Sequence, residues 1–180
     1  MPDRLHLQPA GERRDLLAAP VAAAIDALPV DTGQVLVAEI DPGAADTAEF
    51  CARYGVGLDE SANCVVVAAR RGGLTRLAAC VVLATTRADV NGLVRKHLDA
   101  RRASFAPMEL AVAETGMEYG GITPVGLPPD WPLLVDAAVA KADRVIVGSG
   151  LRRSKLSLPG AVLAGLPGAE VLDGLGQPPR

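Results

Sequence analysis

Hydrophobic residues in the first third of the chain follow helical and strand patterns in turn. Residues 13–28 place their apolar side chains near one face of a helix, which predicts a helix over that range. A turn at residues 31–33 separates it from residues 35–40, an apolar run that predicts a strand. Residues 47–54 predict a short helix. Gly55 is a suitable stop for it, because glycine adopts the left-handed conformation at low cost.

The middle of the chain predicts a β-hairpin. Residues 62–69 and 77–84 are both rich in Val, Ala and Cys, and Arg70-Arg71-Gly72-Gly73 lies between them. Paired glycines suit a tight turn because they accept positive φ angles. Neither run alternates cleanly between apolar and polar positions, which favours strands that are covered on both faces.

Helices and short strands alternate through the second half. Thr86 is placed to cap a helix, with Asp89 as its acidic partner three residues later. Pro107 suits the first turn of a further helix that ends at Gly116. The remaining predicted elements are strands at 121–125, 133–135, 144–148 and near Leu156, and a closing helix at 158–166. This alternation predicts one mixed α/β domain of the α+β type, and residues 175–180 are expected to fray.

The composition agrees with one globular domain and narrows the classes of function. The chain has 180 residues, 49% of them hydrophobic, which is enough for a core without disulfides or metal. Its net charge of −3 argues against a general nucleic-acid coat, although local basic patches still allow a partner such as tRNA. We expect no DNA partner. We also expect no membrane partner, since no apolar run is long enough to cross a bilayer. Scattered cysteines at 51, 64 and 80 are typical of reduced thiols in a cytoplasmic protein.

No group of residues predicts a metal site or a cofactor. His6 and His97 are the only histidines, and neither lies near cysteines or carboxylates at ligand spacing. The same scarcity argues against a Ser-His-Asp mechanism. The turn Gly148-Ser149-Gly150 is too short for a phosphate-binding loop of the Walker type. We therefore expect a protein that works without metal or cofactor.

A loop rich in glycine and proline, Gly120 to Pro128, is the most informative segment. Gly120 and Gly121 allow close approach of the backbone to a ligand, and Pro124 stiffens the loop that follows. Such a loop suits main-chain recognition of a small ligand. A tight connection between two strands explains the same residues equally well.

The flanks of this loop carry a family resemblance. The run Glu114 to Gly126 resembles the signature loop of the YbaK/prolyl-tRNA-synthetase-associated domain family, which consists mostly of aminoacyl-tRNA editing domains. Further matches follow in the family's order at Leu133–Asp136, Val145–Gly150 and Lys155–Leu158. The resemblance implies a YbaK-like domain over 46–174, with residues 1–45 as a helix and strand packed on it. It also implies a curved, mostly antiparallel, barrel-like sheet flanked by helices.

The resemblance also suggests a catalytic group, with one departure from the family pattern. Asn63 stands where editing enzymes of this family commonly have a lysine, and no neighbour in sequence supplies a cation, since Arg70 and Arg71 lie at the far end of the strand. The family places an aspartate at Asp136, near the bound amino acid or ribose; a helix N-cap is an equally good interpretation of this residue. The predicted catalytic residues are Asn63, Gly120, Gly121 and Asp136.

A substrate-binding set follows from the loop, the glycine turn and the basic residues after it. These residues are Thr123, Pro124, Gly126, Ser149, Gly150, Arg152 and Lys155. Arg152, Arg153 and Lys155 are expected to meet the phosphates of a tRNA acceptor end. A second basic group, Arg95, Lys96, Arg101 and Arg102, is a further candidate for tRNA contact, and we favour a solvated surface as its interpretation.

Three functions are compatible with these features. The first is an aminoacyl-tRNA deacylase that acts in trans and removes a wrong small amino acid. The second is a catalytically silent relative that binds a small ligand, a nucleotide or the tRNA end, an alternative that the neutral Asn63 keeps open. The third is a subunit that associates with an aminoacyl-tRNA synthetase.

Overall fold

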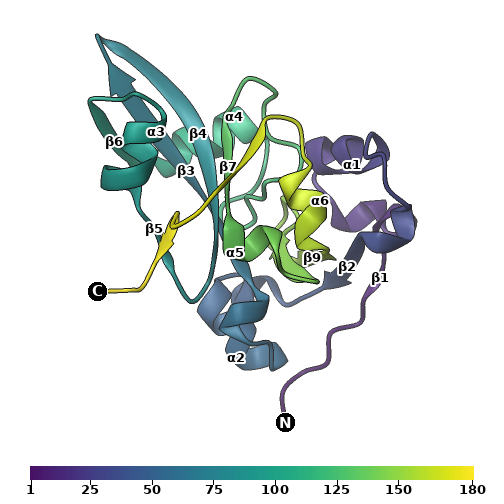
Figure 1. Ribbon diagram of the computed structural model, residues 1–180. Helices are drawn as coiled ribbons and strands as arrows, with labels where there is room; N and C mark the ends of the chain where they lie inside the picture. The colour runs from purple at the N-terminus through teal and green to yellow at the C-terminus, as the bar shows by residue number, and fades with distance from the viewer.

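Two β-sheets form the centre of the molecule, and helices cover them (Figure 1). The computed structural model describes residues 1–180 except for the side chain of Thr32. The larger sheet has five strands in the order β10-β7-β4-β3-β6. Their bounds are Ala169–Leu172 for β10, Leu133–Asp136 for β7, Leu74–Leu83 for β4, Ala62–Arg71 for β3 and Arg102–Phe105 for β6.

The predicted hairpin is confirmed and forms the centre of the larger sheet. Strands β3 and β4 pair antiparallel from Ala62 opposite Leu83 to Arg71 opposite Leu74. Gly72 and Gly73 make the turn with φ angles of 57° and 78°, which only glycine adopts freely at both positions. The strands are longer than predicted, because Arg70 and Arg71 continue β3 instead of joining the turn.

The smaller sheet joins the beginning of the chain to its last third. Its strands, in the order β1-β2-β9-β8, are β1 (Gln8–Pro9), β2 (Leu36–Glu39), β9 (Ser154–Leu158) and β8 (Val145–Gly148), and all neighbours are antiparallel. An isolated bridge from Ser61 to Ile146 connects it to the larger sheet. The sheets therefore do not close into the expected barrel, although the mixed α+β architecture is confirmed.

Six short α-helices surround the sheets. They are α1 (Ala19–Asp26), α2 (Thr47–Tyr54), α3 (Arg95–His97), α4 (Met108–Thr115), α5 (Ala137–Ala140) and α6 (Gly160–Ala164). Helix α2 ends as predicted, with Gly55 at φ 67°, and α4 ends at Gly116 with φ 68°. The main core lies between the sheets and α1, and a second core lies between the larger sheet and the helical turn Val90–Val94 that precedes α3. Among the described residues, no helix has the length and apolar character needed to cross a membrane.

Several expectations about local structure are wrong. The helix expected at 13–28 is divided, because Ala18 is extended and α1 begins only at Ala19. Asp89 caps the turn before α3 in place of Thr86, accepting hydrogen bonds from the main-chain N–H groups of Gly92 and Leu93. The strand expected at 121–125 is a loop, and strands β6 and β10 were missed because both form by pairing with distant partners.

The chain end is also more ordered than expected. Leu175 is fully buried in the second core, and its carbonyl oxygen accepts a hydrogen bond from the main-chain N–H of Asp89. Strand β11 (Gly176–Gln177) pairs with β5 (Arg87–Ala88). Residues 175–177 therefore belong to the fold, because one apolar side chain anchors them.

We predict that removal of residues 175–180 destabilises the protein. Loss of a fully buried leucine typically costs about 2–5 kcal/mol, so the melting temperature should fall by several degrees. Removal of 178–180 alone is the control, because these three residues are exposed. Equal melting temperatures for the two truncated proteins would contradict the anchoring role of Leu175.

Candidate active site

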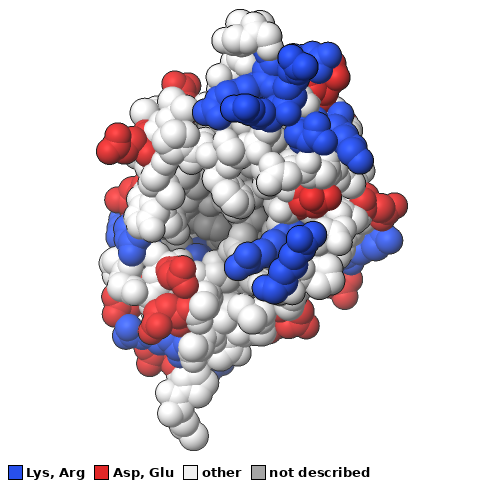
Figure 2. Space-filling model, turned by 90° about the vertical axis from the view of Figure 1, so that its left-hand side faces the viewer, with Lys and Arg blue, Asp and Glu red and all other residues white. Residues whose placement is uncertain are grey.

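A cleft of about 630 Å³ opens between the beginning of α2, the first residues of β3 and the Tyr119–Ile122 segment. Figure 2 shows the face on the β6 side of the molecule, which is hollowed at its centre. Strand β6 covers β3 only from Val67 to Arg70, so the first residues of β3 form an open edge beside the cleft. The lining residues are Ala45, Asp46, Thr47, Ala48, Leu58, Ala62, Asn63, Cys64, Val65, Ala84, Met108, Tyr119, Gly120, Ile122, Gly148, Arg152 and Lys155.

Helix α2 points its N-terminus at the cleft. Asp46 is the N-cap, and its carboxylate accepts a hydrogen bond of 3.1 Å from the main-chain N–H of Ala48. The first N–H groups of a helix lack acceptors within the helix and carry a partial positive charge. This wall of the cleft therefore combines the partial positive charge of the helix end with the Asp46 carboxylate that caps it.

Asn63 lies in the cleft as predicted, and Thr47 fixes its orientation. The hydroxyl of Thr47 donates a hydrogen bond of 2.6 Å to the amide oxygen of Asn63. With the oxygen occupied in this way, the NH₂ group is the end of the amide that remains to donate to a ligand. Asn63 therefore offers two neutral N–H donors.

A cation is nevertheless present in the cleft, and it comes from β9. Lys155 is 8% exposed, and its ammonium donates a hydrogen bond of 2.9 Å to the carbonyl oxygen of Ala45. The ammonium lies 5.2 Å from the centroid of the Phe50 ring, a favourable cation–π distance. The cation that the sequence neighbours of Asn63 do not supply thus comes from Lys155, a residue of the predicted substrate-binding set.

Burial sets the protonation behaviour of Lys155. Loss of hydration lowers its pKa below the ordinary 10.5, while the nearby Cys51 and Asp46 oppose this and Arg152 adds to it. An ammonium has three N–H donors, and one of them is held by Ala45. The group is therefore a partly desolvated cation that gains from an added anionic or carbonyl partner.

The glycine loop contributes main-chain donors to the same cleft. Gly120 has a φ angle of 77°. Within the described part of the chain, the main-chain N–H groups of Gly120 and Ile122 donate to no protein acceptor. Gly120 and Ile122 both line the cleft, so their main-chain N–H groups are candidate oxyanion donors.

Gly121 has a different role from the predicted close approach to a ligand. A Cβ atom at this position would lie 2.8–2.9 Å from the backbone of Leu151. The Gly121 carbonyl oxygen accepts a hydrogen bond of 2.7 Å from the N–H of Gly150. Gly121 is thus a glycine because two backbone segments touch there, and it positions Gly120 and Ile122 indirectly.

Arg152 fastens this loop to the other side of the cleft. Its guanidinium donates hydrogen bonds of 3.1 Å to the carbonyl oxygens of Tyr119 and Pro42, and it lies over the Tyr119 ring. Its main-chain N–H donates to the Glu118 carboxylate at 2.8 Å. Arg152 lines the cleft as predicted, and its contacts show that it also holds the loop in place.

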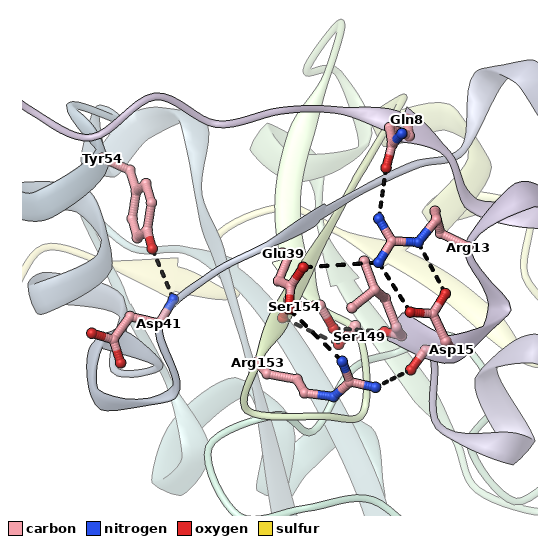
Figure 3. Close-up of polar contacts among 10 residues, drawn as sticks. Gln8, Arg13, Asp15, Glu39, Asp41, Tyr54, Ser149, Arg153 and Ser154 are labelled. Atoms are coloured by element: carbon pink, nitrogen blue, oxygen red, sulfur yellow. Dashed lines mark hydrogen bonds and ion pairs between the residues drawn. The ribbon is translucent and has the colours of Figure 1, made fainter.

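Other predicted site residues lie away from the cleft. Arg153 turns toward the N-terminal segment, where it donates to the carbonyl oxygen of Asp15 and approaches Glu39 (Figure 3). Asp136 accepts a hydrogen bond of 3.2 Å from the N–H of Gly176, so its carboxylate supports the chain end. Its side chain forms no cap hydrogen bond with α5.

The second half of the glycine loop and the following turn are packing features. Thr123 and Pro124 are buried, and Gly126 approaches the backbone of Pro20. Ser149 is fully buried, with its hydroxyl 2.6 Å from that of Ser154 (Figure 3). Gly150 packs against Ala18. The structure therefore brings together Asn63, Gly120, Arg152 and Lys155 from the predicted set.

Residues of α2 were missed as site residues. Thr47 holds the Asn63 side chain, and the carbonyl oxygen of Ala45, just before α2, holds the Lys155 ammonium. Only tertiary packing brings this part of the chain to β3 and β9. The sequence signal available was the N-cap at Asp46. Cys64 also lines the cleft, and burial raises the pKa of its thiol, so it is not a thiolate nucleophile at neutral pH. Within the described residues, no three His, Cys, Asp or Glu side chains gather to hold a metal ion.

Comparison with known proteins identifies a family. The family model described as aminoacyl-tRNA editing domain matches residues 41–166, more than half of the chain. This range contains every lining residue of the cleft. A comparison with curated protein sequences gives no match.

Solved structures share the fold at low sequence identity. One, provisionally assigned as a trans-editing enzyme for prolyl-tRNA synthetase, has a TM-score of 0.73 and 22% identity over 89% of this chain and 96% of that one. Another, the hypothetical protein APE2540, has a TM-score of 0.75 and 23% identity over 88% of this chain and 99% of that one. Both likenesses extend over nearly the whole of the two chains compared.

We predict opposite effects for two threonine substitutions beside the loop. The hydroxyl of Thr123 is buried without a hydrogen-bond partner among the described residues, so Thr123→Val should leave the free energy of unfolding unchanged or raise it by up to about 1 kcal/mol. The hydroxyl of Thr115 donates to the Ala111 carbonyl oxygen and accepts from the N–H of Met117. Thr115→Val should therefore cost about 1–3 kcal/mol. Denaturant unfolding measures both, and a large loss for Thr123→Val would reveal a partner of its hydroxyl.

Proposed function

Because the chain belongs to the family of aminoacyl-tRNA editing domains, we propose that it is a deacylase that hydrolyses wrongly charged tRNA in trans. The observation that carries the proposal is the set of donors that converge on one cleft. Lys155, Asn63, Gly120 and Ile122 all line it, and the main-chain N–H groups of the last two have no acceptor among the described residues. An aminoacyl ester beside the phosphates of an RNA end presents matching acceptors.

The size and lining of the cleft agree with this ligand. A volume of about 630 Å³ lies within the range of roughly 300–1,000 Å³ that is typical of small-molecule sites. Ala62, Ala84 and Met108 supply apolar surface for an amino-acid side chain. A pocket of fixed size admits small side chains and excludes large ones, which is the sieving that editing requires.

In the proposed reaction, water attacks the ester carbonyl carbon and the bond to the ribose oxygen breaks. The products are a free amino acid and the tRNA 3′ end, and the proton lost by the water passes to the leaving ribose oxygen. The N–H groups of Gly120 and Ile122 stabilise the oxyanion, an effect typically worth about 2.7–4 kcal/mol for one donor.

The remaining groups bind and orient the substrate. The Lys155 ammonium binds a phosphate or ribose oxygen. This hydrogen bond replaces those to water that the ammonium loses on burial. The Asn63 amide donates a second, neutral hydrogen bond. Asp46 is engaged as a helix cap and Cys64 is a neutral thiol. The family resemblance suggests that the neighbouring ribose hydroxyl of the substrate assists the water.

We predict that the purified protein deacylates at least one member of a panel of tRNAs mischarged with small amino acids. Lys155→Met should lower kcat/KM roughly tenfold to a hundredfold, because a hydrogen bond to a charged group contributes about 1.5–3 kcal/mol. Lys141→Met is the matched control, since Lys141 is exposed and lies outside the cleft. A folded protein that binds the tRNA end but hydrolyses no member of the panel would support the silent relative instead.

The same Lys155→Met variant tests the buried charge by its pH dependence. The lowered pKa means that the unfolded chain binds more protons than the folded chain between that pKa and 10.5. The stability of the unliganded protein should therefore rise with pH across this window. The rise should disappear in Lys155→Met. An unchanged profile would show that Lys155 is hydrated like a surface lysine.

Two substitutions of Asn63 should change the affinity for a tRNA end in opposite directions. Asn63→Asp keeps the acceptor for Thr47 but replaces the NH₂ donors by a carboxylate that repels phosphate, so binding should weaken at least about tenfold. Asn63→Lys adds a second cation and should strengthen binding, while its unpaired ammonium lowers the stability of the unliganded protein. Equal affinities for both variants, measured by fluorescence anisotropy, would remove Asn63 from the binding site.

A further inference from the structure

Four arginines that are distant in sequence meet at the end of the β3–β4 hairpin. Arg70 and Arg71 end β3, and Arg101 and Arg102 lead into β6. Arg70 is opposite Arg102 in the sheet, and the N–H of Arg101 donates a hydrogen bond of 2.9 Å to the carbonyl oxygen of Arg70. We call these four residues the hairpin arginine cluster. They line a shallow hollow of about 460 Å³ beside the turn.

The positive charge of the hairpin arginine cluster is only partly compensated. Arg71 lies 3.4 Å from the carboxylate of Asp99, an exposed contact, and such surface pairs contribute little. Among the described residues, the side chains of Arg101 and Arg102 form no hydrogen bond or ion pair with the protein. This excess of positive charge is local, because the whole chain has a net charge of −3.

Figure 2 shows where basic side chains gather on this face. Lys and Arg residues concentrate at its upper end, the end at which the β3–β4 hairpin projects in Figure 1. The central hollow lies below them on the same face. A ligand that extends out of the hollow toward the hairpin would therefore meet positive charge.

Strand β3 connects the cleft to the cluster. Asn63 is at the cleft end and Arg71 at the other end of the same strand, a separation of roughly 25 Å at about 3.3 Å per residue. Phe105 lies between them, opposite Val67, and is 64% exposed. Phe105 also lines a second hollow that meets the cleft at Asn63 and Val65. The surface between cleft and cluster thus carries an exposed aromatic ring.

We propose that the hairpin arginine cluster binds the phosphates of the tRNA acceptor arm while the aminoacylated end occupies the cleft. The inference rests on the proposed function, which places that end in the cleft. A tRNA acceptor arm is a duplex with a short unpaired terminus, so its backbone continues outward from a bound 3′ ribose. Guanidinium groups match phosphate geometry by paired hydrogen bonds, and Phe105 provides a surface on which an unpaired base stacks.

The distance and the chemistry favour RNA over other occupants. A protein that bound only the terminal nucleotide would have no use for a cationic site about 25 Å away. An acidic protein is the alternative occupant. If it were the ligand, substitutions in the cluster would leave the affinity for tRNA unchanged. The cluster supplies charge without base-reading side chains, so it should raise affinity for many tRNAs alike.

The test uses the full chain with Arg101→Glu and Arg102→Glu together. The control carries Arg4→Glu and Lys141→Glu, which change the net charge equally at exposed positions outside both the cleft and the cluster. Affinity for uncharged tRNA is measured by fluorescence anisotropy across a salt series. The cluster variant should bind at least about tenfold more weakly, and its salt slope should fall by about two, because fewer counterions are released. The control should match the unchanged protein.

A second measurement separates this proposal from the proposed function. Hydrolysis of a 3′-aminoacyl-adenosine, which is too short to reach the cluster, should be equal in the cluster variant and the unchanged protein. Hydrolysis of aminoacyl-tRNA should show a raised KM in the cluster variant only. Equal tRNA affinity and salt slope in the two variants, or no salt-dependent tRNA affinity in the unchanged protein, would overturn the docking proposal. Absence of hydrolysis from all substrates, with the difference in tRNA affinity intact, would overturn the deacylase alone.

Discussion

Contact between two backbone segments holds the candidate site together. Gly121 and the Gly148–Leu151 segment approach each other very closely. A Cβ at Gly121 would lie 2.8–2.9 Å from main-chain atoms of Leu151, and a Cβ at Gly148 would lie 2.6–3.0 Å from main-chain atoms of Gly121 and Ile122. The hydrogen bond from Gly150 to Gly121 lies at this contact. One segment presents the N–H groups of Gly120 and Ile122, and the other leads into β9 and Lys155. The relative positions of the proposed oxyanion donors and the cation therefore depend on the absence of two side chains.

The buried lysine shows how the cleft handles charge. Full desolvation of an unpaired ammonium is expensive, and the Ala45 carbonyl and the Phe50 ring offset only part of that cost. The unliganded protein therefore retains a cation that is stabilised less than in water. A ligand oxygen that accepts a further hydrogen bond from the Lys155 ammonium is therefore bound more strongly. The neutral Asn63 is consistent with this arrangement, because a second lysine beside the first would add repulsion to the cost of burial.

Local sequence patterns predicted the elements that depend on near neighbours. The glycine turn at 72 and 73 and the helix stops at Gly55 and Gly116 all appear in the structure. Elements formed by long-range pairing were missed, such as β6 and β10, because a run of only four residues has little periodicity of its own. A buried leucine likewise gives order to a chain end that composition alone predicts to fray.

The candidate site was predicted in part. Family resemblance located Asn63 and the glycine loop, and Asn63 and the beginning of the loop line the cleft. The resemblance could not show which side chains turn inward. In the stretch 152–155, Arg152 and Lys155 reach the cleft, whereas Arg153 points to the N-terminal segment. Asp136 follows its strand as expected, but the packing of the chain end captures its carboxylate. Side-chain direction is a tertiary property, and a linear motif does not contain it.

The pairing of β2 with β9 has a consequence for how the protein is made. Leu36 in β2 is opposite Ser157 in β9, so this sheet cannot form until most of the chain has left the ribosome. The β3–β4 hairpin, by contrast, joins neighbouring segments and can form early. The residues of the hairpin arginine cluster are therefore synthesised before Lys155, so the segment proposed to bind the acceptor arm precedes the one that completes the cleft.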